Sequence, residues 1–188
     1  MRLTRSAFAV PLMCVLLSNS SSSRFAGMVV TPTIISPSLV PAKTTSSVLY
    51  DAWELGSSGL SKDAFEKAYK GYEFLQSKCL LKITNLLTIV DYSMSSAHKR
   101  LFVLDMAAGK VLFNSLVAHG RNSGLGQATD FSNAGESHKT SLGFYITMDT
   151  YRGSNGYSLK LKGCEQGIND NAQKRAIVIH GADYVSEN

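Results

Sequence analysis

Residues 100–118 read RLFVLDMAAGKVLFNSLVA, and this stretch decides the fold. Two runs of β-branched and apolar residues flank the short segment MAAG at 106–109. Gly109 can adopt the positive φ angle that a tight turn requires. The pattern therefore predicts a β-hairpin whose strands lie on either side of MAAG.

The same texture continues on both sides of this hairpin. NLLTIVDYS at 85–93 predicts an earlier strand. SLGFYITMDT at 141–150 and GYSLKLKG at 156–163 flank YRGSN at 151–155, and together they predict a second hairpin. AIVIHG at 176–181 predicts a last strand. We therefore expect a mainly β domain built from antiparallel strands.

A helix is predicted before the strands, over LSKDAFEKAYKGYEFLQSK at 60–78. Ser61 is a suitable N-cap, and Asp63 favours the first turn. Gly71 weakens the prediction slightly, because glycine is a poor helix former. The apolar residues on one face, which predict core packing rather than a ligand site, are Phe65, Ala68, Tyr69, Tyr72 and Leu75.

The N-terminus has the three parts of an export signal. Arg2 and Arg5 give a positive start, AFAVPLMCVLL at 7–17 is apolar but too short to span a bilayer, and small residues follow. We expect residues 1–20 to be a signal peptide and the protein to be exported to the periplasm of a Gram-negative cell. Residues 21–47, rich in Ser, Thr and Pro, predict a linker.

Composition limits the class of partner. The formal charge is +5. Without residues 1–20, which hold two arginines and no acidic residue, 17 basic minus 14 acidic residues leave +3. No Lys/Arg block is present, so nucleic acid is a disfavoured partner. No segment after the signal is long and apolar enough to predict a transmembrane span. Oligomeric state is left open.

Glycine-rich and histidine-containing segments predict neither a cofactor nor a metal. GRNSGLG at 120–126 lacks the Gly-Lys-Ser/Thr that a phosphate-binding loop needs. The four histidines are scattered without metal-ligand spacing. The loop that holds GRNSGLG, residues 119–140, is long and poor in apolar residues. Such a loop is usually functional or disordered.

His180 and Gly181 end the last predicted strand, where a histidine suits a general base. Asp183 could orient the ring, although a structural histidine is the commoner outcome for such a position. Cys164 follows a strand without the pattern of an activated thiol. Cys79 and Cys164 could pair in an oxidising compartment, and the sequence leaves that pairing open.

Four segments resemble one family in order and spacing. They are KRLFVLDMAAGKVLFNSLVAHGRNSG (99–124), SLGFYIT (141–147), GYSLKLKG (156–163) and GINDNAQKRAIVIHGADYVS (167–186). The chain is similar, from about Leu60 onward, to the murein L,D-transpeptidase catalytic domain (YkuD-like) family. This resemblance implies a β-sandwich or barrel domain preceded by an N-terminal helix. The expected divisions are the helical segment at 48–83 and the catalytic-like domain at 84–188.

The resemblance also implies a chemistry and a site. Members of the family transfer acyl groups between peptidoglycan stem peptides through a cysteine. In this chain His180 matches the base and Gly181 the glycine beside it. Gly143 and Phe144 match a strand that lines the cleft, and the segment 119–124 matches a loop leading into it. The implied substrate-binding residues are His119, Gly120, Arg121, Gly143 and Phe144.

One family feature is missing. The nucleophile of the family lies in a Ser-x-Gly-Cys loop after the His-Gly pair, and no such motif occurs in these 188 residues. We therefore expect a C-terminally incomplete domain that is inactive and poorly stable alone. Two alternatives stay open: a non-catalytic periplasmic peptidoglycan-binding module, and a hydrolase using Ser123 or Ser186 with His180. The second lacks a Gly-x-Ser-x-Gly elbow.

Overall fold

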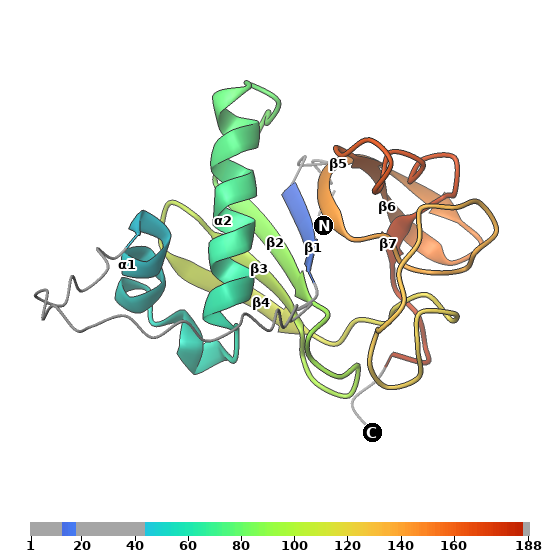
Figure 1. Cartoon of the computed structure of the whole chain (residues 1–188), viewed down its shortest axis with the longest axis horizontal. Coiled ribbons are helices and arrows are strands. Elements are labelled where there is room, and N and C mark those ends of the chain that lie inside the picture. Colours follow the sequence, from blue (N-terminus) through green and yellow to red (C-terminus); the bar gives the residue numbers. More distant parts are fainter. Residues whose placement is uncertain (1–12, 18–43, 186–188) are drawn as a thin grey trace, which may run out of the picture.

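The structure is a computed structural model that describes residues 13–17 and 44–185. The predicted linker lies almost wholly outside the described residues, as do most of the predicted signal peptide and Ser186. From residue 45 onward, two helices precede a set of antiparallel strands, with more strand than helix (Figure 1). The expectation of a mainly β domain behind a single helix is thus corrected to a mixed fold.

The helical part consists of α1 (Thr45–Ala52), the 3-10 turn η1 (Leu55–Ser58) and α2 (Lys62–Ser77). Helix α2 confirms the sequence prediction, and the Ser61 hydroxyl caps it by accepting from the Ala64 N–H at 3.2 Å. Ser61 also donates to the buried Asp91 carboxylate at 2.7 Å, which ties the start of α2 to the end of the strand at Leu86–Asp91. No helix in the described ranges has the length and apolarity to cross a bilayer.

The strands from residue 86 onward form two antiparallel three-stranded groups. Strands β2, β3 and β4 make the first group, and β5, β6 and β7 make the second. Both predicted hairpins are confirmed, and Gly109 has a φ of +64° in the first turn. The bounds are β2 Leu86–Asp91, β3 Leu101–Asp105, β4 Lys110–Ser115, β5 Gly143–Gly153, β6 Gly156–Gly163 and β7 Val178–His180.

The two groups are joined by β1, Met13–Leu17. Its backbone pairs in parallel with β2, where Val15 faces Ile89, and antiparallel with β5, where Val15 faces Phe144. The resulting order is β4-β3-β2-β1-β5-β6-β7, with β4 and β7 at its two ends. The resemblance implied a β-sandwich or barrel, and the described strands form two antiparallel groups joined in one open sheet, with no barrel closure between β4 and β7. The same five residues belong to the predicted signal peptide, whose cleavage stays a prediction.

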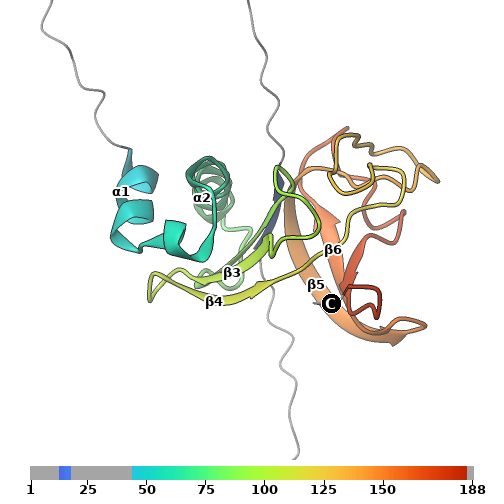
Figure 2. The ribbon, with the colours of Figure 1, turned by 90° about the horizontal axis from the view of Figure 1, so that it is seen from below.

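The first core lies where the helices cover β2 and β3 (Figure 2). Leu87 and Ile89 of β2 point toward α2, as do Phe102 and Leu104 of β3, and all four side chains are fully buried. Alternation along the strands produces this arrangement, because residues two apart lie on the same face of a sheet. The predicted apolar stripe of α2 packs against them.

The second core lies over β5 and β6, on the sheet face turned away from the helices. It contains Val90, Tyr92, Tyr145 and Leu161. Tyr145 and its neighbour Phe144 lie on opposite faces of β5, because successive side chains of a strand alternate. Phe144 packs against the first core, whereas Tyr145 is buried in the second. This second face carries the cavity described next.

Candidate functional site

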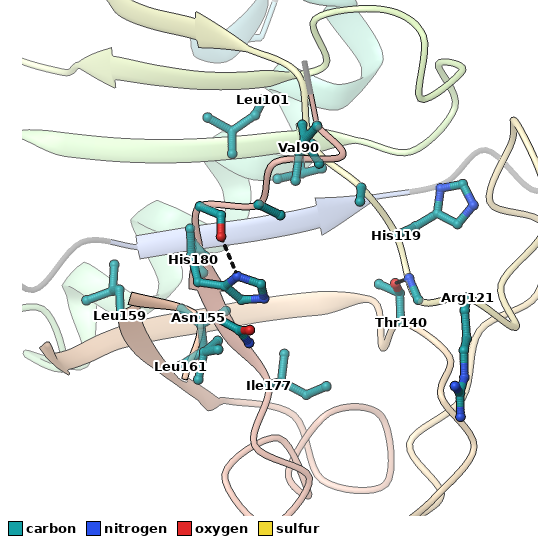
Figure 3. Close-up of a pocket in the computed structure, with 18 of the residues that line it drawn as sticks. Val90, Leu101, His119, Arg121, Thr140, Asn155, Leu159, Leu161, Ile177 and His180 are labelled. Carbon is teal, nitrogen blue, oxygen red and sulfur yellow. Dashed lines mark hydrogen bonds between the residues drawn. The ribbon is translucent and has the colours of Figure 1, made fainter. Parts of the chain in front are cut away.

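A cavity of about 1270 Å³ opens on the second face (Figure 3). Its floor is apolar and comes from the second core and the strand residues around it: Val90, Leu101, Leu159, Leu161, Ile177 and Ile179. Its walls come from residues 115–121, from 136–140, and from β7 with the residues that follow it. A space of this size exceeds what a single small molecule needs, so it suits an extended ligand such as a peptide.

His180 stands on the cavity wall at the end of β7. The strand is held by β6, where His180 pairs with Ser158 in the register. The ring Nδ1 lies 2.8 Å from the Gly181 carbonyl oxygen. Because a carbonyl can only accept, Nδ1 carries the proton and Nε2 keeps a free lone pair. Among the described residues Asp183 makes no hydrogen bond with His180, so Gly181 rather than Asp183 fixes this ring.

His119, on the opposite wall, has both ring nitrogens engaged. Its Nδ1 accepts from Arg100 Nη2 at 2.8 Å, because a guanidinium has no acceptor atom. Its Nε2 then carries the proton and donates to the Gly124 carbonyl at 3.2 Å. The Tyr92 ring packs edge-on against the imidazole, with centroids 6.5 Å apart. His119 therefore holds its loop in place, and its proposed contact with substrate stays a prediction.

Arg100 is the residue that the sequence did not reveal. Its side chain is fully buried, yet it forms no ion pair among the described residues. Nε and Nη2 donate to the Val117 carbonyl at 3.1 and 2.9 Å, and Nη1 donates to the Met94 carbonyl at 2.9 Å. Burial lowers the pKa of this guanidinium from its usual value. A charge that is buried on neutral acceptors costs stability, so its retention beside a cavity wall points to a positioning role.

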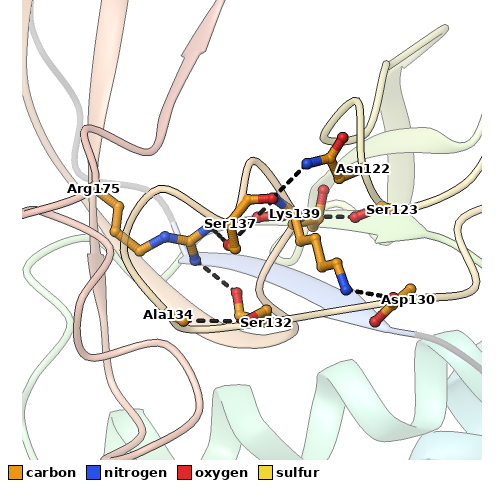
Figure 4. A network of polar contacts seen from close by, with 9 residues as sticks. Asn122, Ser123, Asp130, Ser132, Ala134, Ser137, Lys139 and Arg175 are labelled. Carbon is orange, nitrogen blue, oxygen red and sulfur yellow. Dashed lines mark hydrogen bonds and ion pairs between the residues drawn. The ribbon is translucent and has the colours of Figure 1, made fainter.

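The long loop predicted at 119–140 is ordered by a second arginine, Arg175 (Figure 4). Its guanidinium donates to the carbonyls of Ser132 at 2.7 Å and Lys139 at 2.5 Å. It also donates to the hydroxyls of Ser137 and Ser141. A single side chain thereby fastens both arms of the loop to the segment that leads into β7.

Backbone strain also collects at the cavity. Glu136, His138 and Ala176 line it, and each has a φ angle near +53°, a region that L-residues rarely occupy. Such conformations persist only where surrounding contacts enforce them, and they cluster at functional sites. Among the described residues no group of three His, Cys, Asp or Glu side chains could hold a metal ion.

Gly143 and Phe144, which the resemblance assigned to the cleft, do not line the cavity. Phe144 faces α2, and a Cβ added to Gly71 would lie 2.0 Å from its ring. Gly143 has a φ of +106°, and its backbone sits against the side chains of Glu165 and Asn169. The Glu165 carboxylate accepts from the Phe144 N–H at 2.7 Å. In the structure, then, both residues secure β5 outside this cavity, and their contact with substrate stays a prediction.

The two cysteines with described side chains are free thiols outside the cavity. Cys79 is exposed, whereas Cys164 is partly buried. Burial, helped by the neighbouring Glu165 carboxylate, raises the pKa of the Cys164 thiol. Cys164 follows the last residue of β6 and is six residues from Ser158, the register partner of His180, which corresponds to about 20 Å at about 3.3 Å per residue. His180 cannot deprotonate it across that distance.

Ser123, like the two cysteines, is not placed to act as a nucleophile in the cavity. It is fully buried, its hydroxyl accepts from the Thr140 N–H at 2.8 Å, and it does not line the cavity. Ser186 lies outside the described residues.

Comparison with known proteins gives one match. Residues 56–188 match the family described as the L,D-transpeptidase catalytic domain. Neither the search of curated proteins nor that of solved structures gave a match.

Proposed function

The chain belongs to the L,D-transpeptidase catalytic domain family, and on that premise we propose that its cavity binds the peptide stems of peptidoglycan. The observation that carries the proposal is the placement of His180. Its ring stands on the wall of a cavity large enough for a peptide, where Nδ1 is bonded to a carbonyl and Nε2 has no hydrogen-bond partner among the described residues. An apolar floor can accommodate peptide side chains, and the polar walls can orient the backbone.

The reaction for which the placement of His180 is suited is cysteine acyl transfer, which needs a thiol at the cavity. His180 Nε2 takes the proton of a thiol, and the thiolate attacks the amide carbonyl that precedes the terminal D-alanine of the donor stem. The histidine then returns that proton to the leaving amine, so D-alanine departs and a thioester remains. An amine of a second stem attacks the thioester, transferring the acyl group and regenerating the thiol. A Cβ added to Gly181 would meet no atom of the described residues within 4 Å, so there is open space beside the ring.

Among the side chains that the structure describes, no thiol lies at the cavity. Cys79 is on the surface, and Cys164 is about 20 Å along the sheet from His180. For this reason we also propose an alternative function: a peptidoglycan-binding module that holds stem peptides without transferring acyl groups. The export-like N-terminus supports the periplasm as the place where it acts.

The test compares binding with turnover. The full chain is incubated with a disaccharide tetrapeptide, and binding is followed by calorimetry while released D-alanine is measured by mass spectrometry. We expect binding without release. A carbapenem, which acylates reactive cysteines of such enzymes, should leave the intact mass unchanged. Release of D-alanine, or an adduct on Cys164, would contradict the binding-module proposal. Failure to bind any stem peptide would contradict the wider proposal.

A further inference from the structure

The segment HGRNSG, residues 119–124, presents one side chain that its own loop does not use. Gly120 has no room for a Cβ, which would lie 2.5 Å from the His138 carbonyl oxygen. Asn122 donates its amide to the Ser137 carbonyl at 2.9 Å. Ser123 is buried, and Gly124 has a φ of +140°. With His119 bonded at both ring nitrogens, five of the six residues hold the loop together.

Arg121 is the exception. Its side chain is exposed, lines the cavity and forms no hydrogen bond or ion pair among the described residues. The other two cations on the cavity wall are already occupied: Arg175 by the loop, and Lys139 by an ion pair with Asp130. The single acidic residue on the wall, Glu136, makes no ion pair with any of them. The wall therefore carries an uncompensated positive charge at Arg121.

We propose that Arg121 is the docking point for a free carboxylate of the stem peptide. A guanidinium presents a planar pair of N–H donors that matches a carboxylate, and such charge-assisted pairs fix orientation as well as affinity. Arg121 and His180 project from different walls of the cavity (Figure 3). The carboxylate bound by Arg121 consequently lies away from the amide bond next to His180. Arg121 thereby sets the position of the peptide along the cavity.

This inference rests on the proposed function, since it names the group by which the same cavity recognises its ligand. It requires the ligand to be an anionic peptide. It also predicts that removing the Arg121 guanidinium weakens binding only when the peptide carries its carboxylates. A structural role for Arg121 would produce no such coupling, because loss of structure weakens all ligands alike.

The experiment is a two-by-two cycle with the full chain. The probes are a fluorescent tetrapeptide stem ending in D-alanine and the same peptide with every carboxylate converted to an amide. The proteins are wild type, Arg121→Met, the charge-retaining Arg121→Lys, and Lys110→Met as a control. Lys110 is an exposed cation on β4, outside the cavity. Anisotropy gives the Kd for each pair, and thermal unfolding confirms that each variant is folded.

We expect Arg121→Met to weaken the acidic peptide about tenfold and to change the amidated peptide by less than about twofold. Arg121→Lys should lose less than Arg121→Met, and Lys110→Met should change neither peptide. Equal weakening of both peptides by Arg121→Met, or weakening of neither, overturns the inference while leaving the proposed function intact. Failure of wild type to bind either peptide overturns both.

Discussion

Substituting Gly71 by alanine should destabilise the protein, although alanine is the better helix former. Gly71 lies in the interior of α2, where Gly→Ala normally stabilises by about 1 kcal/mol. Here the added Cβ would lie 2.0 Å from Cε1 of Phe144 and 2.3 Å from Cζ. Ordinary contact begins near 3.4 Å, so the ring has to retreat by 3.4 minus 2.0, or 1.4 Å.

That retreat is costly because the ring is packed on a sheet strand. Phe144 belongs to β5, and its N–H is bound by the Glu165 carboxylate at 2.7 Å. Overpacking a well-filled core costs about 1 to 3 kcal/mol, and the size of this displacement places the cost near the upper figure. Subtracting the propensity gain of about 1 kcal/mol leaves a net destabilisation of about 2 kcal/mol.

The assay is urea unfolding followed by circular dichroism, with Lys70→Ala, an exposed neighbour on α2, as the control. The decisive arm is the Phe144→Val background, which removes the ring atoms. There Gly71→Ala should stabilise by about 1 kcal/mol, because only the propensity term survives. A Gly71→Ala variant that is stabilised in the wild-type background would refute the placement of Phe144 against α2. So would equal effects in the two backgrounds.

Three further predictions concern single side chains. The exposed Cys79 should be alkylated faster than the partly buried Cys164. Because burial raises the pKa of the Cys164 thiol, its alkylation rate should still increase with pH above the ordinary thiol pKa. Equal alkylation rates at the two cysteines, measured by peptide mass spectrometry, would contradict this. Ser61→Ala should cost about 1 to 2 kcal/mol of unfolding free energy in urea, since it removes both a cap and a hydrogen bond to Asp91. Arg100→Met should lower the free energy of unfolding by about 3 kcal/mol, because it leaves buried acceptors without donors. An unchanged urea midpoint would contradict the role of Arg100 in holding these carbonyls.

The strands from residue 86 onward and α2 could be predicted from the sequence because their patterns are local. Period-two alternation and a glycine turn identify the hairpin around Gly109, and the apolar stripe of α2 follows the helical period. Strand β1 escaped prediction because a short apolar run after two arginines has the composition of an export signal and of a buried strand alike. Composition cannot distinguish the two, whereas pairing with β2 and β5 depends on residues distant in the sequence.

For the same reason, the sequence identified only part of the candidate site. His180 could be chosen because a histidine at a strand end is visible in the sequence. Phe144 was assigned to the cleft through its motif, and the face it occupies depends on strand register, in which one residue decides the side. Arg100, at the start of a hairpin strand, has the pattern of a solvated cation until the loop carbonyls close around it. Long-range contacts determine these outcomes.

The central claim is that stem peptides bind in the cavity between His180 and the loop at 119–140. The most direct measurement is a titration of isotope-labelled protein with a disaccharide tetrapeptide, followed by two-dimensional NMR that includes the imidazole resonances. We expect saturable shifts at His180, at Arg121 and at Asn155 on the cavity rim, with the exposed face of α2 unchanged. Shifts confined to α2 or β4, or no shifts at millimolar peptide, would contradict it.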